Sequence, residues 1–178
     1  MLASLVLLVV PVQAGVNSWT STGVEGGGIT ALGWHPTRSG VLFAASGRVY
    51  RSTDSGAHWT AVSGSGPVLG NFVFDPSSPD RILVSGQPVL RSTDGGASFA
   101  PATPMPDQNF VARLAITNSG SAVYAASGGR VFRSTDFAQS WTEISNGLPG
   151  SAAGGPGSLR ISPSDSNTLY VSYATSGL

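Results

Sequence analysis

Apolar and β-branched residues occur along the chain in short runs separated by clusters of Gly, Pro, Asn and Asp. Runs of about five to eight such residues between turn-forming residues predict β-strands, and they leave no room for helices. The predicted strands are 29–35, 41–45, 48–52, 58–62, 71–74, 81–84, 89–92, 98–102, 111–117, 122–126, 130–134, 140–144, 158–162 and 168–173. The pattern therefore predicts an all-β protein.

The sequence also contains an internal repeat. Residues 49–59, VYRSTDSGAHW, return as VLRSTDGGASF at 89–99 and as VFRSTDFAQSW at 131–141. The aspartates of the three copies are 40 and 42 residues apart, and four predicted strands fall within each period. Four antiparallel strands in a period of about 40 residues are typical of one blade of a β-propeller.

This period divides the chain into repeats of about 24–63, 64–103 and 104–145 and a partial repeat at 146–178. We therefore predict a β-propeller of four-stranded antiparallel blades, with about 3.5 to 4 blades of a larger propeller present. A fourth repeat aspartate would fall near 181 or 182, so strand 168–173 is expected to have an open edge that promotes self-association. Trp19, 40 residues before Trp59, would begin an outer strand that completes a blade.

The repeated segment, Ser/Thr-x-Asp-x-Gly-x-x-Trp/Phe between a third and a fourth strand, resembles the Asp-box, also called the bacterial neuraminidase repeat (BNR). Sialidases, xyloglucan-hydrolysing glycosidases, the sortilin luminal domain and photosystem II assembly factors contain this element. The resemblance implies a propeller with the box on its perimeter, in a structural role. Because these proteins differ in activity, the resemblance does not select a function.

Physical chemistry gives the box residues the same structural role. The Asp can accept turn N–H groups, the Ser hydroxyl can bond locally, the Gly can take a positive φ, and the aromatic residue can seal the hairpin. The residues are Ser52, Asp54, Gly56 and Trp59, then Ser92, Asp94, Gly96 and Phe99, then Ser134, Asp136 and Trp141. The third copy has Ala138 instead of glycine, for which we expect a strained or altered turn at a cost of about 1 kcal/mol.

The N-terminus differs from the rest of the chain. Residues 5–10 are an unbroken apolar run, followed by Pro11 and by small residues ahead of Gly15. We interpret 1–14 as a signal peptide and 15–178 as a secreted or otherwise extracytoplasmic propeller; the alternative is that the run is a buried strand or an incomplete leader. The run is shorter than the roughly 20 residues of a spanning helix, so no membrane span is expected.

Composition argues against several classes of function. Charged residues make up 10% of the chain, the formal net charge is zero, and the 9 basic residues are all Arg, so a large basic patch for nucleic acid is not expected. The absence of Cys and the presence of only 2 His argue against a disulfide framework and against a metal site. We expect no cofactor.

Two features of the sequence resemble parts of enzymes. Arg51, Arg91 and Arg133 are equivalent in the three repeats, so propeller symmetry should hold them apart instead of forming the arginine triad of a sialidase. Segment 25–36 is similar to a segment of the xyloglucan-hydrolysing family, but the loops after the predicted second strands lack that family's carboxylate. Glycoside hydrolysis needs two carboxylates about 5 to 9.5 Å apart, whereas Glu25 and Asp107 lie about two repeats apart. We expect no catalytic residue in this chain.

Binding is the function that remains. In a propeller, the loops between second and third strands and the connections between blades share one face, and loops held by rigid sheets are the usual place for binding. The chemically distinctive residues there are Glu25, Arg48, Asp107 and Arg130. We predict a non-catalytic binding or assembly scaffold that takes a protein or carbohydrate ligand on this face. The alternative is a glycoside hydrolase, xyloglucanase-like or sialidase-like, whose catalytic carboxylates are missing from this chain.

Overall fold

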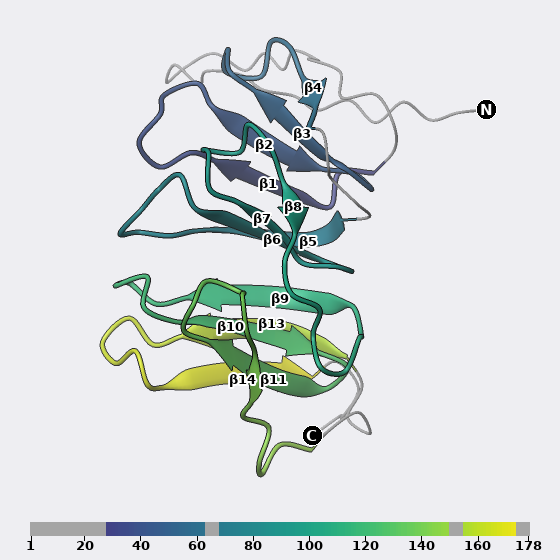
Figure 1. Ribbon diagram of the computed structural model, residues 1–178, viewed down its shortest axis with the longest axis vertical. Helices are drawn as coiled ribbons and strands as arrows, with labels where there is room; N and C mark the ends of the chain where they lie inside the picture. The colour runs from purple at the N-terminus through teal and green to yellow at the C-terminus, as the bar shows by residue number, and fades with distance from the viewer. Residues whose placement is uncertain (1–27, 63–67, 150–154, 174–178) are drawn as a thin grey trace, which may run out of the picture.

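The computed structural model describes residues 28–62, 68–149 and 155–173, and every regular element in these ranges is a β-strand (Figure 1). The first sheet contains β1 (Ala31–Trp34), β2 (Leu42–Ala45), β3 (Val49–Ser52) and β4 (Thr60–Ala61). The second contains β5 (Val68–Phe74), β6 (Ile82–Gly86), β7 (Leu90–Ser92) and β8 (Ala100–Pro101). The third contains β9 (Val111–Ile116), β10 (Val123–Ser127), β11 (Arg130–Ser134) and β12 (Thr142–Glu143), and the last contains β13 (Pro156–Ile161) and β14 (Leu169–Tyr173).

The order of strands within each sheet is the order along the chain, and all neighbours are antiparallel. The first strands of consecutive sheets are neighbours in space, β5 beside β1 and β9, and β13 beside β9. The sheets therefore stack in chain order along the long axis of the molecule, with the first and last sheets at opposite ends (Figure 1). The prediction of four-stranded antiparallel sheets in an all-β chain is confirmed.

Apolar clusters fill the space between consecutive sheets. Between the first and second sheets, Phe43 is fully buried with its ring centroid 5.8 Å from that of Phe72 and 5.9 Å from that of Phe74. Leu83 and Leu114 are buried between the second and third sheets, as are the residues around Tyr124 between the third and last. Strands β6 and β10 are buried along their whole length because both of their faces are covered, which explains their continuous apolar sequences.

The outer strands are shorter than the sequence predicts. Runs 58–62, 98–102 and 140–144 are each reduced to two residues of ladder, in β4, β8 and β12. All six of these residues are exposed, so little apolar burial stabilises a longer ladder. Single backbone bonds continue the pairing, such as the one from Val62 N–H to the Val49 carbonyl at 2.9 Å.

Strand β5 begins three residues earlier than predicted, and it contains a β-bulge between Val68 and Phe72. Gly70 lies so close to the neighbouring strand that a Cβ would come within 1.6 Å of Ser85 Oγ. The same hydroxyl accepts the Asn71 N–H at 2.7 Å. The bulge glycine interrupts the apolar run, which is why the sequence pattern placed the strand start after it.

Side chains join the first strands of neighbouring sheets. Asn71 Nδ2 donates to the Leu114 carbonyl, and Asn71 Oδ1 accepts the Leu114 N–H, both at 2.9 Å. At the equivalent position of the third sheet, Arg113 Nε donates to the Gly157 carbonyl at 3.1 Å. These bonds satisfy backbone groups that have no strand partner on that side.

Some predictions fall outside the described residues. The interpretation of 1–14 as a signal peptide and the roles given to Trp19 and Glu25 belong to this group. Within the described ranges, no helix has the length and apolarity needed to cross a membrane.

Candidate functional site

Consecutive turns of an antiparallel meander lie at alternate ends of its sheet. The turns after the first and third strands share one end of each sheet, which we call the turn face. The turns after the second strands and the connections between sheets share the other end, which we call the loop face. The three Asp-containing turns belong to the turn face, whereas the predicted ligand residues were expected on the loop face.

The Asp-containing turns share one hydrogen-bond pattern. In the second turn, Ser92 Oγ donates to Asp94 Oδ1 at 2.7 Å and accepts the Gly96 N–H at 2.9 Å. Asp94 also accepts the Ser98 N–H at 3.0 Å and the Ser98 hydroxyl at 2.5 Å. The third turn repeats these bonds through Ser134, Asp136, Ala138 and Ser140. The first turn repeats them through Ser52, Asp54 and Gly56, with the His58 N–H and its ring nitrogen Nδ1 in place of the N–H and hydroxyl of Ser98.

These donors lower the pKa of each of the three carboxyl groups from 3.8 to about 2. The largest cause is the His58 N–H for Asp54 and the Ser140 hydroxyl for Asp136. For Asp94 the largest single effect is desolvation, which raises the pKa, and the bonds from Ser98 and Ser92 together outweigh it. A carboxyl group with so low a pKa is ionised at neutral pH and has no proton to give as a general acid.

Gly96 satisfies two requirements of its turn. Its φ is +76°, and a Cβ at this position would come within 2.2 Å of the Phe43 ring in the preceding sheet. The third turn keeps this backbone conformation although it has Ala138 in place of glycine, at a φ of +65°. Of the two expected outcomes, the turn is therefore strained and not altered. At the equivalent place in its preceding sheet, Leu83 replaces Phe43, and the smaller side chain leaves room for the Ala138 Cβ.

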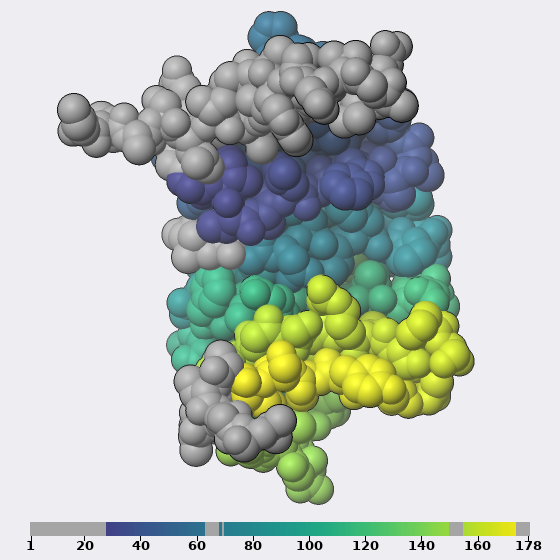
Figure 2. All heavy atoms as spheres, turned by 180° about the vertical axis from the view of Figure 1, so that it is seen from behind, coloured from purple at the N-terminus to yellow at the C-terminus, as the bar shows by residue number. Residues whose placement is uncertain are grey.

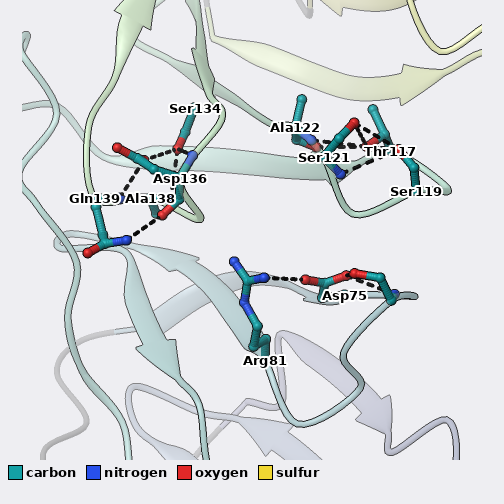
Figure 3. Close-up of polar contacts among 11 residues, drawn as sticks. Asp75, Arg81, Thr117, Ser119, Ser121, Ala122, Ser134, Asp136, Ala138 and Gln139 are labelled. Carbon is teal, nitrogen blue, oxygen red and sulfur yellow. Dashed lines mark hydrogen bonds and ion pairs between the residues drawn. The ribbon is translucent and has the colours of Figure 1, made fainter.

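The third turn also reaches into the second sheet through Phe137. The ring is buried, and its centroid lies 4.0 Å from Arg81 Cζ and 5.5 Å from Arg91 Cζ. Arg81 additionally places a guanidinium nitrogen 3.0 Å from Oδ2 of the fully buried Asp75 (Figure 3). Arg91 is therefore used in packing between sheets, and Arg133 is exposed at the equivalent position of the third sheet.

The loop face contains a pocket between the second and third sheets, with a volume of about 360 Å³. Its walls come from the β6–β7 turn and the β8–β9 connection. The lining residues are Gly86, Gln87, Pro88, Val89, Pro104, Met105, Gln108 and Asn109. Val89 and Met105 are buried and form an apolar floor. The two walls are joined at the rim, where Gln87 Nε2 donates to the Gln108 carbonyl at 2.5 Å.

Asp107 supports the rim of this pocket. Its carboxylate accepts the Asn109 N–H at 3.2 Å, the Asn109 side-chain amide at 3.3 Å and the Ser127 hydroxyl at 3.4 Å. Gly128 lies against the same amide, since a Cβ there would come within 2.6 Å of Asn109 Nδ2. Asp107 thus holds the β8–β9 connection against the β10–β11 turn.

The other predicted ligand residues are not part of this pocket. Arg130 pairs with Glu143 on the outer strand β12, at 3.2 Å. Arg48 is exposed in the β2–β3 turn, and Glu25 lies outside the described residues. The prediction that these four residues form one ligand site stays a prediction, and of the four it is Asp107 that lies at the edge of this pocket.

Sequence reasoning missed the pocket because its lining consists of uncharged residues from two separate loops. Neither loop carries a recognisable chemical signature, and the prolines around Met105 indicated only a long crossing between sheets. The available signal was Met105 itself, a large apolar residue between two prolines in the connection before β9. Such a residue has to be buried against something, which here is the β6–β7 turn.

The described residues offer limited chemistry for catalysis on the loop face. Among them, no group of three His, Asp or Glu side chains is arranged to hold a metal ion. The eight residues that line the pocket include no acid, and Asp107 is the single carboxylate of the 86–89 and 104–109 segments that form it. Glycoside hydrolysis uses two carboxylates flanking the bond that breaks, and these segments do not supply them.

Comparison with known proteins bears on the fold. No protein-family model and no curated sequence matches the chain. An ancestral GH74 enzyme superposes over 88% of this chain with a TM-score of 0.73 at 18% identity, and the GH74 xyloglucanase from Xanthomonas campestris superposes over 82% with a TM-score of 0.66 at 24% identity. This chain has a β-propeller fold.

A third propeller structure, YCF48 bound to D1 peptide, superposes over 88% of the chain with a TM-score of 0.57 at 16% identity. The chain spans 25% and 26% of the two GH74 structures and 51% of the YCF48 structure. The stacked sheets described above therefore correspond to propeller blades. At these identities the likeness concerns the fold alone.

Proposed function

We propose that this propeller is a non-catalytic binding scaffold that holds a segment of a protein ligand on its loop face, with one apolar side chain of the ligand in the pocket above Val89 and Met105. The observation that carries the proposal is the pocket itself, which has a buried apolar floor and an amide rim. Its loops are anchored on two packed blades, as in most binding sites of rigid scaffolds.

The chemistry of the pocket favours a peptide over a sugar. A volume of about 360 Å³ is at the lower end of the range for ligand pockets, which suits one side chain better than an oligosaccharide. The thioether of Met105 adapts to apolar groups of different shapes. The amides of Gln87 and Asn109 provide donors and acceptors that match a peptide backbone.

One of the superposed structures supports the same class of ligand. YCF48 has been solved with D1 peptide, so a propeller of this general form can bind a peptide. The D1 peptide is a ligand of YCF48. The peptide that the present chain binds can be identified by selecting peptides from a random library.

The test is a selection of peptides from a displayed random library on the 178-residue chain. Selected peptides should bind the wild-type chain and lose at least about tenfold in affinity for Gln87→Trp, whose larger side chain covers the pocket opening. Thr142→Trp, an exposed substitution on β12, is the matched control and should bind normally. Equal affinity for Gln87→Trp and the wild type would remove the pocket from the proposal.

The alternative function is that of a part of a glycoside hydrolase, a class of enzyme to which the two superposed GH74 structures belong. Under this alternative, the catalytic carboxylates are missing from this chain, and its loop face binds xyloglucan oligosaccharides, which should compete with the selected peptides. Under the scaffold proposal, xyloglucan oligosaccharides do not displace the selected peptides.

We also infer that the three Asp-containing turns are Asp-box repeats and that the protein acts outside the cytoplasm. The serine and aspartate bonds common to the three turns support the first inference. The apolar run at 5–10 followed by small residues supports the second. N-terminal sequencing of the exported protein should give Gly15 as the first residue, and a protein that keeps Met1 inside the cell would contradict this location.

A further inference from the structure

The three interfaces between consecutive blades are built in the same way. Each first strand directs two large side chains, which we call the front pair, toward the preceding blade. Each second strand directs one large side chain, which we call the rear residue, toward the following blade. The front pairs are Phe72 and Phe74, Leu114 and Ile116, and Leu159 and Ile161; the rear residues that meet them are Phe43, Leu83 and Tyr124.

The strand registers define these positions without reference to sequence similarity. In each blade, one residue lies between the two members of the front pair, and its cross-strand partner is the rear residue of the same blade. Val73 is paired with Leu83 in this way, and Ala115 is paired with Tyr124. By the same register, Tyr170 pairs with Arg160 and is the rear residue of the last blade. The front pair of the first blade is Leu32 and Trp34, which flank Gly33, the partner of Phe43.

The front pair of the first blade and the rear residue of the last blade are exposed. Leu32 is 52% exposed, Trp34 69% and Tyr170 63%, whereas Phe43, Leu83 and Tyr124 are at most 5% exposed. Burying a large apolar side chain is favourable, and it stabilises an interface that removes the side chain from water. The described residues therefore leave open two halves of an interface that is built three times between their own blades.

The two halves cannot meet within one stack, because the first and last blades lie at its opposite ends (Figure 1). The view from behind shows the same order, with the last blade and the first blade separated by the second and third (Figure 2). Among the described residues, neither half has a partner. A second copy of this chain offers such a partner, because its last blade presents a rear residue and its first blade presents a front pair, the two halves that pack together at the three interior interfaces.

We propose that the front pair Leu32 and Trp34 is a docking surface for the rear residue Tyr170 of a second copy of this chain, giving head-to-tail association through an interface like those between its own blades. This contact is distinct from pairing along the open edge of β14. Arg160, the cross-strand partner of Tyr170, is exposed beside it and meets the indole of Trp34, the aromatic ring that cations prefer. Head-to-tail interfaces close into rings or extend into chains, according to the rotation that each contact imposes.

The test uses the whole 178-residue chain in two variants that each remove one half. The front variant carries Leu32→Asp and Trp34→Asp, and the rear variant carries Tyr170→Asp. Sedimentation velocity should show concentration-dependent association of the wild type, and a dissociation constant raised at least about tenfold in each variant alone. An equimolar mixture of the two variants should form dimers again, because the front of one and the rear of the other are intact. Ile144→Asp, at a residue 38% exposed outside both surfaces, should associate like the wild type.

Several results would overturn the proposal. A wild type that stays monomeric at all concentrations would do so, as would a mixture of the variants that does not associate. Association of the rear variant alone would indicate a front-to-front contact, and association of the front variant alone a rear-to-rear contact. Loss of association in Ile144→Asp would indicate unspecific apolar adhesion. If an aspartate variant fails to keep the far-UV circular dichroism of the wild type, Trp34→Ser and Tyr170→Ser replace it.

Discussion

Ser92 and Asp94 show how a single side-chain pair can organise a turn. The buried hydroxyl connects the carboxylate to the Gly96 N–H, and the exposed carboxylate gathers the donors of Ser98. Exposed charges usually contribute little to stability. Here the carboxylate satisfies backbone N–H groups of a turn that contains residues with positive φ, so it acts in the way that a helix N-cap residue does.

Asp94→Ala should lower stability by about 1 kcal/mol, the typical effect of losing a cap, because the Ser98 and Ser92 donors lose their acceptor. Thermal denaturation followed by circular dichroism measures this as a lower Tm. Asp94→Asn, which keeps one acceptor oxygen, should lose less. If Asp94→Ala instead kept its Tm and lost binding of the selected peptides, the ligand site would lie on the turn face.

The three turns should also make the protein sensitive to acid. Asp54, Asp94 and Asp136 have a pKa of about 2 in the fold against an ordinary 3.8, so protons bind more tightly to the unfolded chain than to the folded one. Their contribution to stability is complete above about pH 4 and is lost as the pH falls toward about 2. The urea concentration at the midpoint of unfolding should therefore decrease as the pH is lowered from about 4 to about 2, in a series measured from pH 5 to pH 2.

The control for this effect is the chain with all three aspartates changed to Asn. Its urea midpoint should be lower at pH 5 and should change less on acidification. A wild-type midpoint that does not change between pH 4 and pH 2 would show that these carboxylates have ordinary affinities for protons.

At the scale of the strands, the sequence was informative wherever a strand is buried on at least one face. The boundaries of β2, β3, β10 and β11 agree with the apolar runs to within one residue. The strands β1, β6 and β13 differ from their predicted runs by two residues at one end. The outer strands and β5 were predicted less well, for two physical reasons. The two ladder residues of each outer strand are exposed, so burial does not fix where the ladder ends, and the Gly70 bulge hides the first residues of β5 from any pattern of alternation.

The bonds of Asn71 make a second prediction at this scale. Asn71→Ala would leave the N–H and carbonyl of the nearly buried Leu114 without their partners, and a buried unsatisfied group costs about 1 to 3 kcal/mol. Hydrogen exchange should show faster exchange of the Leu114 amide, together with a lower Tm. Asn118→Ala, at an exposed turn residue, is the control that should change neither. Unchanged protection of Leu114 would mean that solvent replaces the Asn71 side chain at little cost.

For the whole molecule, the repeat period was the strongest predictor, because a period of about 40 residues leaves few folds to choose from. The binding face was harder to foresee. Its pocket joins Gln87 to Gln108 across two loops, and that contact depends on how one blade is rotated against the next. The rotation between two blades depends on close contacts such as that between Phe43 and Gly96. The repeat period of the sequence does not reveal such contacts.

That interlocking can be tested with a double-mutant cycle. Gly96→Ala alone should destabilise the chain by about 2 to 3 kcal/mol, since it adds overpacking against Phe43 to the strain of a positive φ. In a Phe43→Leu background, which reproduces the Leu83 and Ala138 combination of the next interface, the same change should cost about 1 kcal/mol. Urea unfolding of the four proteins gives the coupling energy. Equal costs in both backgrounds would show that Phe43 does not restrict position 96.

The contact between Phe43 and Gly96 has a consequence for the ancestry of the chain. A blade that arises by gene duplication inherits its own rear residue, but the turn residue that must fit against this side chain is encoded in the blade after it. The heritable unit is therefore offset from the blade, running from the second strand of one to the Asp-containing turn of the next. Among homologues, a side chain larger than hydrogen at position 96 should occur together with a residue smaller than Phe at position 43, and recombination between blades should be tolerated when the crossover keeps such a pair on one parent.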